Sequence, residues 1–437
     1  MPHPQRDIFE HQINNLKDCI VAQLGHSIIT KGDCDKLSES IETSVRKSVS
    51  VNTLRRFFVA MPTLSRPSSE TLNILSQYCG FLDLRDFQRS VAQKTNAKSD
   101  LSLNGVNDLY QAFGDTRQFY QTLAWLVQLA FRDQNISFLK SFFQLDVLKE
   151  KFDYSIGEHK KVLNTLGAEL QANPTQFDIL IGHYASDPIA QTLYFECFVD
   201  YDFLPTRHYK AIELYSQHKM GSEAQLFSLC ILFLHSFLLR DRASCSDLLR
   251  KINAIELPPD LHPFPLGRKM ACNILFQFFY HGKIKESLIR DIFAFEKQLP
   301  RNGSLGRNTP IYHTLVGEAF AWAGYHEEAL SIIELAIESY NTDVNYHNQG
   351  TLSNLWITYA HSLLKSNRVQ ESESVFSKVN VDHFDVNTKN FTLMHYYKVS
   401  SELKKLSNPK LAASLERSSL EIAANYKFKF FEALYSA

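Results

Sequence analysis

Apolar residues recur along most of this chain at the 3.6-residue spacing of an amphipathic helix. Segments rich in Leu and Phe repeat the pattern almost everywhere, and no alternation typical of a β-strand lasts beyond a few residues. Gly and Pro, at 16 and 14 of 437 residues, are below their average usage, which also favours helices. The pattern therefore predicts an all-α protein.

The segment from residue 308 to residue 340 shows this pattern most clearly. It predicts two helices joined by a tight turn at Gly324, with Val316 and Ile333 among their apolar positions. Small residues such as Gly317 lie on both helices, where they let the two axes approach closely. A single hairpin of this kind cannot bury its own apolar face, so we expect further hairpins beside it.

The hairpin that begins at Pro310 resembles a tetratricopeptide repeat. The positions that match the family's motif are Val316 and Gly317 for its leucine–glycine pair, Ala319 and Phe320 for its alanine–aromatic pair, Gly324 for its turn glycine, and Ala329 and Ala336 for the alanines of its second helix. Asn341 stands where the family has a proline. The resemblance implies a helix pair that stacks on similar pairs.

Weaker versions of the same hairpin begin near residues 186, 227, 268, 353 and 394. The six starts are 41 to 43 residues apart, longer than the family's usual repeat, so we expect longer helices or joints. The resemblance implies a right-handed α-solenoid over residues 118–437, phased from about residue 186; the helices of residues 118–185 have no regular period. The tail after residue 420 predicts a last helix that covers the open end.

The first 95 residues are expected to form four or five short helices. Together these helices predict a small separate domain. One of them follows Ser50 or Asn52, either of which can cap it, and Leu54 lies on its apolar face. Residues 96–117 are polar and contain two glycines, so they predict a linker with one short helix.

The order of these N-terminal helices resembles the lambda-repressor-like helix-turn-helix module. The match rests on the run SVNTLRR at residues 50–56, on the run PSSETLNIL at residues 67–75, and on Gly80, and it covers about 55 residues. Residues 45–49 depart from the family, because they make the turn longer than usual. The resemblance implies that the helix at residues 52–58 lies in the major groove of double-stranded DNA.

The local charge fits such a role. Net charge is −1 for the whole chain, but residues 43–69 carry five basic side chains and no acidic one. The resemblance implies that Arg55 or Arg56 reaches a base edge or a phosphate and that Asn52 reads adenine. Contacts to the DNA backbone would come from three further basic residues, Arg46, Lys47 and Arg66. The alternative is that these side chains form the solvated face of a helical cap.

In a tetratricopeptide-like solenoid, the first helix of each pair lines the concave side. Counting equivalent positions of each unit places nine residues in this groove: His235, Lys269, Phe276, Tyr280, Glu318, Trp322, Asn354, His361 and Lys365. Aromatic, amide and charged groups together suit a peptide or protein ligand, whose backbone needs donors and acceptors. Alternatively, the aromatic residues belong to the core between repeats, and the His and Lys side chains are solvated.

Motifs for catalysis, metal binding and cofactor binding are not apparent in the sequence. It has no phosphate-binding glycine loop, zinc-protease helix or serine-nucleophile elbow, and no His lies at zinc-ligand spacing from Cys. We therefore expect a protein that is not an enzyme and has no metal or cofactor. The seven Cys residues form no C-x-x-C pair, which indicates reduced thiols in the core.

The sequence also gives no indication of a membrane protein. The N-terminal residues have no apolar signal-peptide core, and the most apolar run, residues 226–239, is too short to span a bilayer. We expect a soluble, cytoplasmic protein.

A helix-turn-helix followed by tetratricopeptide-like hairpins is similar in layout to the peptide-responsive bacterial transcription regulators. That resemblance implies a regulator that binds DNA through its N-terminal helices and a peptide or protein through its solenoid. Pairing of two DNA-binding heads would make it a homodimer. The alternative is a non-catalytic interaction scaffold, in which the N-terminal helices are a cap and DNA is not bound.

Overall fold

The fold is described from a computed structural model of the chain. The residues that it describes are 13, 16–17, 19–21, 23–24, 28, 30–58, 67–84, 86–87, 101–114, 116–152, 157–257, 262–299, 309–342 and 349–436. These residues are helical or lie in turns and loops, and no β-strand occurs among them. The prediction of an all-α protein is therefore confirmed for this part of the chain.

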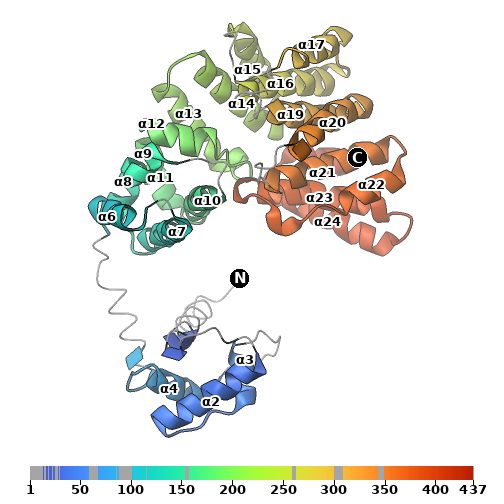
Figure 1. Cartoon of the computed structure of the whole chain (residues 1–437). Helices are drawn as coiled ribbons and strands as arrows, with labels where there is room; N and C mark the ends of the chain where they lie inside the picture. Colours follow the sequence, from blue (N-terminus) through green and yellow to red (C-terminus); the bar gives the residue numbers. More distant parts are fainter. Residues whose placement is uncertain are drawn as a thin grey trace. The chain divides into compact units, whose positions relative to one another are not determined.

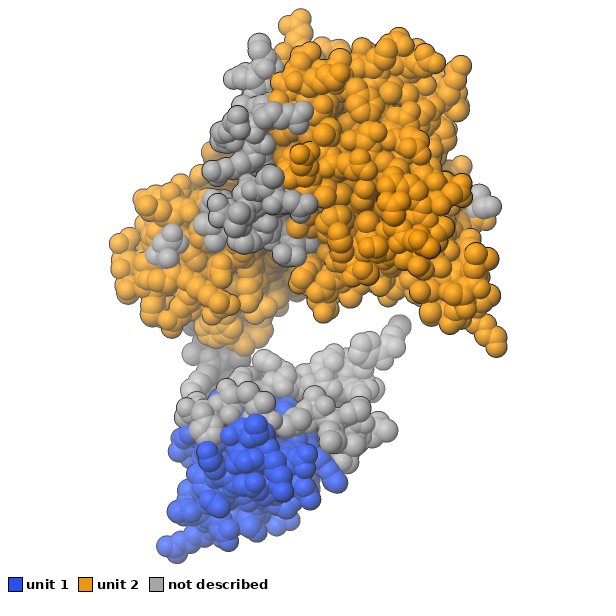
Figure 2. All heavy atoms as spheres, turned by 45° about the vertical axis from the view of Figure 1, so that its right-hand side comes forward, with its two compact units in different colours: residues 1–100 blue, residues 101–437 orange. Residues whose placement is uncertain are grey.

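The chain divides into two compact units, residues 1–100 and residues 101–437, here called unit 1 and unit 2 (Figure 2). Each unit has its own cluster of buried apolar residues. Helix α6 (Leu103–Phe113) lies in the segment expected to be a linker, and its residues Val106 and Tyr110 are buried in the core of unit 2. Residues 103–113 are therefore packed as part of unit 2.

Unit 1 contains helices α2 (Lys31–Val45), α3 (Val51–Phe58) and α4 (Ser69–Tyr78) (Figure 1). The backbone N–H of Thr53 donates to the hydroxyl of Ser50 at 3.2 Å, so Ser50 rather than Asn52 caps α3. Helix α2 ends where Arg46 adopts a left-handed φ of 55°, and Val49 is buried in the turn that follows. These contacts fix the direction of α3 relative to α2.

The first half of unit 2 consists of helices without a regular period, as expected for residues 118–185. After α6 come α7 (Arg117–Arg132), α8 (Ile136–Ser141), the 3-10 helix η1 (Phe142–Gln144), α9 (Asp146–Glu150), α10 (Gly157–Ala172), α11 (Pro174–Ala185), α12 (Pro188–Ala190) and, further on, α13 (Tyr209–His218).

Near residue 186 the chain does not form the regular hairpin that the repeat spacing predicted. Two π-helical segments, η2 (Gln191–Glu196) and η3 (Leu204–His208), lie between α12 and α13 instead. Phe198, between them, packs directly against α10 at Gly167, where a side chain would collide with its ring. The regular helix pairs therefore begin at α14.

From α14 onward the described helices follow one another as five consecutive pairs, and the two helices pack closely in all but the second pair (Figure 1). The pairs are α14 (Ser222–Leu238) with α15 (Arg242–Ala254), α16 (Pro263–His281) with α17 (Glu286–Glu296), α19 (Thr309–Trp322) with α20 (His326–Thr342), α21 (Gln349–Lys365) with α22 (Val369–Phe376), and α23 (Lys389–Lys404) with α24 (Pro409–Asn425). Two 3-10 helices, η4 (Val381–His383) and η5 (Val386–Thr388), precede α23. The first helices of successive pairs pack against one another, which is compatible with an α-solenoid.

The α19–α20 pair is held close by its small residues, as the sequence predicted. Gly324 in the turn has a φ of 74°, a conformation that glycine adopts without steric cost. A Cβ atom at Gly317 would lie 2.5 Å from Cγ1 of Ile333 on α20. Any side chain at residue 317 would therefore push the two helices apart.

The segment at the start of α23 contacts the segment between the two π-helical segments η2 and η3. The buried carboxylate of Asp202 accepts hydrogen bonds from the backbone N–H groups of Asn390 and Phe391, at 2.9 and 2.8 Å. Asn387 donates from Nδ2 to the carbonyl oxygen of Val199 at 2.9 Å. These contacts join segments that are almost 190 residues apart in sequence. They fix the start of α23 against the segment between η2 and η3.

The tail does not form one helix over the open end, contrary to our expectation from the sequence. It forms a separate helix, α25 (Lys429–Ser436), whose side chains Phe430 and Phe431 are buried. The ring centres of Phe430 and Phe237 on α14 are 4.2 Å apart. Those of Phe431 and Trp322 on α19 are 5.1 Å apart. Burial of these rings draws α25 onto the side formed by the first helices of the pairs.

Candidate functional site

Helix α3 of unit 1 presents a polar face to solvent. Asn52, Arg55 and Arg56 are exposed, whereas Leu54 and Phe57 are buried in the core of unit 1. Two guanidinium groups and an amide on one exposed helix can donate hydrogen bonds to phosphates and base edges.

Two further basic residues lie in the turn before α3. Arg46 and Lys47 are both exposed, and the ammonium group of Lys47 donates to Oε1 of Gln77 on α4 at 3.2 Å. The hydroxyl of Ser38 donates to the carbonyl oxygen of Val49 at 2.8 Å, which ties the turn to α2. Arg66, the remaining basic residue of the predicted DNA-binding set, lies outside the described residues.

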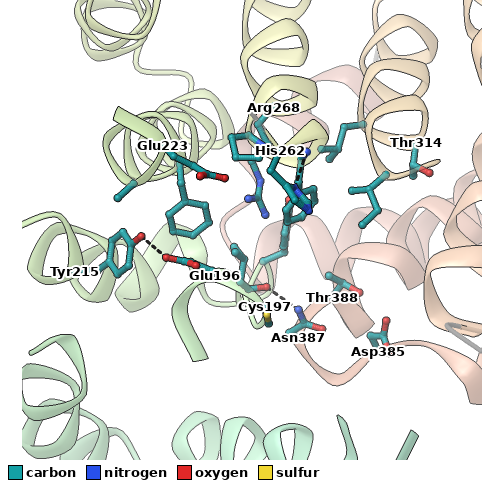
Figure 3. A pocket seen from close by; sticks show the side chains of 18 of the residues that line it. Glu196, Cys197, Tyr215, Glu223, His262, Arg268, Thr314, Asp385, Asn387 and Thr388 are labelled. Atoms are coloured by element: carbon teal, nitrogen blue, oxygen red, sulfur yellow. Dashed lines mark hydrogen bonds between the residues drawn. The ribbon is translucent and has the colours of Figure 1, made fainter. Parts of the chain in front are cut away.

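The second candidate site is a cavity of about 910 Å³ within unit 2 (Figure 3). One wall comes from η2, α13, α14 and α16, and the facing wall comes from α19, α21, η5 and the start of α23. The hydrogen bonds of Asp202 and Asn387 hold these walls together, because Asn387 and Phe391 themselves line the cavity. Its volume lies in the range of small-molecule binding sites.

Arg268 is the most unusual residue of the cavity lining. It is only 5% exposed, and its guanidinium carbon lies 3.8 Å from the ring centre of Phe264 and 4.9 Å from that of Phe227. Its Nε and Nη1 atoms are buried without a hydrogen-bond acceptor among the described residues. Figure 3 shows this side chain extending from α16 into the space among the other labelled side chains. Buried charges without an ionic partner are costly in folded proteins.

The other lining cations are paired with carboxylates. The ammonium group of Lys219 contacts Oε1 of Glu196, which also accepts a hydrogen bond from the hydroxyl of Tyr215 at 2.6 Å. The ammonium nitrogen of Lys160 on α10 lies 2.6 Å from Oδ1 of Asp385. The first ion pair joins η2 to the end of α13, and the second joins α10 to the residue before η5, so both Lys side chains that line the cavity among the described residues are paired.

Two of the nine residues predicted for the solenoid groove line this cavity. Nδ2 of Asn354 on α21 donates to Oε1 of Glu318 on α19. Burial raises the pKa of Glu318 to about 8, so its carboxyl group is mainly protonated at neutral pH. Glu318 can then act as a hydrogen-bond donor as well as an acceptor.

The three aromatic residues of the predicted groove take part in packing elsewhere in unit 2. Phe276 is buried and packs against Phe233 of α14. Tyr280 is half-buried on the same helix, 5.1 Å from Phe276 between ring centres. Trp322 packs against Phe431 of the tail helix, so α25 covers this part of the side where a ligand was expected.

The four remaining groove candidates also lie away from the cavity lining. His235 is half-buried and stacks on Tyr209 with 4.3 Å between ring centres. Lys269 and His361 are half-buried, and Lys365 is exposed and forms an ion pair with a glutamate of α23. The structure thus brings Glu318 and Asn354 together and distributes the other seven over the core and surface of unit 2. Partner binding at those seven residues stays a prediction.

The residues that give the cavity its character, above all Arg268, Phe264 and Phe227, were not predicted from the sequence. One signal was available, because Arg268 and Lys269 interrupt a run of mostly apolar residues at positions 263–280. A charged residue within such a run is exposed, paired or part of a site, and periodicity alone does not distinguish these cases.

In the described part of the chain, no group of three or more His, Cys, Asp or Glu side chains is arranged to hold a metal ion. None of the helices described is long and apolar enough to cross a membrane. Comparison of the chain with protein-family models, with curated proteins and with solved structures found no match.

Proposed function

We propose that this protein is a transcription regulator, in which unit 1 binds double-stranded DNA through α3 and unit 2 binds a regulatory ligand. The observation that carries the proposal is the orientation of α3. Its apolar residues Leu54 and Phe57 anchor it in the core, and Asn52, Arg55 and Arg56 are left exposed on one short helix.

The surroundings of α3 support its use as a recognition helix. The resemblance of unit 1 to the lambda-repressor-like helix-turn-helix assigns α2 and α3 to the two helices of that motif. The turn between them exposes Arg46 and Lys47, which can contact phosphates on either side of a groove. Residues 43–69 contain no acidic side chain that would repel the DNA backbone.

The ligand half of the proposal is supported by the cavity of unit 2. It has the volume of a small-molecule site and combines aromatic rings with a few buried polar groups. In the layout of the peptide-responsive bacterial regulators, a peptide or protein would act through the helix pairs. The coverage of Trp322 by α25 favours the cavity over an open groove as the place of binding.

DNA binding is tested by fluorescence anisotropy with the purified full chain and a labelled duplex of mixed sequence, titrated at low and then increasing salt. We expect binding at low salt that weakens as salt rises, because phosphate contacts release counterions. Arg55→Ala combined with Arg56→Ala should weaken binding at least tenfold and lower the salt slope by about 2.

A matched control removes the same charge elsewhere on unit 1. Lys31 and Lys36 are exposed on α2. Replacing both with Ala should change the affinity for DNA less than threefold, because salt screens charges that lie far from the DNA. Absence of binding by the unmodified chain at low salt would refute the DNA half of the proposal. An equal loss in both double variants would refute the role of α3 and leave only a general charge effect. Either result would favour an interaction scaffold without DNA binding.

A further inference from the structure

We infer that the cavity of unit 2 is a binding site for a compact organic anion, whose carboxylate or phosphate group accepts hydrogen bonds from Arg268. The inference deepens the proposed function and rests on it only for the role of the ligand in regulation. Binding itself is a property of unit 2.

The guanidinium group of Arg268 has the environment of an anion receptor. Its central carbon lies over the rings of Phe264 and Phe227, 3.8 and 4.9 Å from the ring centres, which restricts the position of the group. Two of its nitrogen atoms are buried without an acceptor among the described residues. A guanidinium group with a restricted position and unused N–H donors is well suited to bind a carboxylate or a phosphate.

The neighbouring charges leave Arg268 as the cation to which a ligand anion would bind. Lys219 is occupied by Glu196, and Lys160 by Asp385. No ion pair to Arg268 is present in the described part of the chain, although the carboxylates of Glu196 and Glu223 also belong to the lining. A ligand anion would therefore fill an electrostatic requirement that the described residues leave open.

The shape of the site favours a compact ligand over an extended chain. A volume of about 910 Å³ accommodates a molecule of small-ligand size. The adjacent side of the helix pairs is covered by α25 through Phe430 and Phe431, which removes the open groove that an extended peptide would follow. Aromatic side chains in the lining, such as Tyr201 and Phe391, can contact the apolar body of the ligand.

A second anchor lies on the facing wall. Glu318 and Asn354 come from different helices and meet in the lining, where they offer both donors and acceptors. Since burial raises the pKa of Glu318, its carboxyl group is mainly neutral at neutral pH and does not repel an anion. A ligand with an anionic end and a polar group at the other end would use both anchors.

The test measures the thermal unfolding of unit 2 in the full chain by tryptophan fluorescence, because Trp125, Trp322 and Trp356 all lie in this unit. The probes are benzoate, phenyl phosphate, benzylamine and benzyl alcohol, each at about 10 mM and constant ionic strength. They share one ring and differ in the charged or polar group. We expect benzoate or phenyl phosphate to raise the Tm by about 2–4 °C and the amine and alcohol to leave it unchanged.

The variant Arg268→Met keeps the length and apolar contacts of the side chain but removes its charge. We expect it to abolish the Tm shift caused by the anion and to leave the Tm of the ligand-free protein equal or higher, because an unpaired buried charge is lost. The control is Arg290→Met on α17, where the side chain is 72% exposed, and there the anion response should be intact. If Arg268→Met does not fold, Arg268→Gln provides the second variant, and the anion-induced shift must fall at least fivefold there.

The two anions decide which chemical group the site recognises, according to which gives the larger shift. The inference would be overturned if neither anion raised the Tm of the unmodified chain. It would also be overturned if the anion raised the Tm of Arg268→Met by the same amount. These measurements contain no DNA, so the two proposals can fail separately. Anion binding without DNA binding would support the cavity as an anion site and refute the proposed role as a transcription regulator. DNA binding without any anion response would support DNA recognition by unit 1 and refute the anion site.

Discussion

Replacing Asp202 with Ala is the most direct test of how the two walls of the cavity are joined. Asp202 is 2% exposed and lies between η2 and η3. Its Oδ1 accepts from the backbone N–H of Phe391 at 2.8 Å, and its Oδ2 accepts from the backbone N–H and the side-chain Nδ2 of Asn390, at 2.9 and 2.8 Å. The substitution removes the acceptor for all three donors.

The size of the effect follows from these contacts. A buried donor left without a partner costs about 1–3 kcal/mol, which applies to the N–H of Phe391, and the two half-buried donors of Asn390 cost less. Part of this cost is offset, because burial raises the pKa of Asp202 and the variant no longer buries a carboxylate. We therefore expect Asp202→Ala to lower the free energy of unfolding of unit 2 by about 2–4 kcal/mol.

Two assays measure this outcome on the full chain. Urea unfolding followed by tryptophan fluorescence reports on unit 2, since all three Trp residues belong to it. Hydrogen exchange measures the wall itself, and we expect faster exchange in residues 385–392, where the lost contacts were.

The matched control is Asp247→Ala. Its side chain is 48% exposed on α15, where it pairs with Arg250 and Lys251, and we expect no resolvable loss of stability. If Asp202→Ala unfolds at the same urea concentration as this control and exchange in residues 385–392 is unchanged, the closing contacts do not hold the cavity walls.

Two further predictions concern packing and pH. Gly317→Ala should lower the free energy of unfolding by about 1–3 kcal/mol, because the new Cβ would lie 2.5 Å from Cγ1 of Ile333. Gly182→Ala on α11, where no heavy atom lies within 4 Å of the new Cβ, should instead stabilise by about 0.5–1 kcal/mol, and urea unfolding with equal losses in both would contradict this account. Burial, and secondly the charge of Asp202, raise the pKa of Asp200 from 3.8 to about 7, so the folded state holds a proton there that the unfolded chain releases. Stability should therefore fall by roughly 4 kcal/mol at this group as pH rises from about 4 to about 7. Asp200→Asn should accordingly gain stability relative to the unmodified chain between about pH 5 and about pH 8 in urea unfolding, and a difference independent of pH would contradict the assignment.

Helix content, the strongest hairpin and the orientation of α3 were accessible from the sequence because they depend on local patterns. The small residues of the α19–α20 pair and the turn at Gly324 are encoded within one segment, and the structure has both. The exposure of Arg55 and burial of Leu54 follow in the same way from apolar spacing over a single helix. The role of α3 in DNA binding stays a prediction.

Periodicity could not distinguish residues in the core from residues in a cavity. Counting repeat positions placed Trp322 and Glu318 in one groove, yet Trp322 packs against the tail helix and Glu318 lines the cavity. The same counting could not find the site of Phe264 and Arg268, because Arg268 is the first position of a repeat unit and Phe264 falls before that start. Their meeting depends on neighbours from other helices.

By itself, then, the sequence determined the helices of this protein, the succession of helix pairs from α14 onward, and the polar face of α3. Each depends on residues a few positions apart, whose spacing sets the apolar face of one helix or hairpin. Only the tertiary structure decided that α25 covers the first helices, that Asp202 holds the start of α23, and that Arg268 lies buried without an ionic partner among the described residues. The contacts of Asp202 join segments almost 190 residues apart, and their positions depend on small angles accumulated over several helix pairs, which no local pattern records.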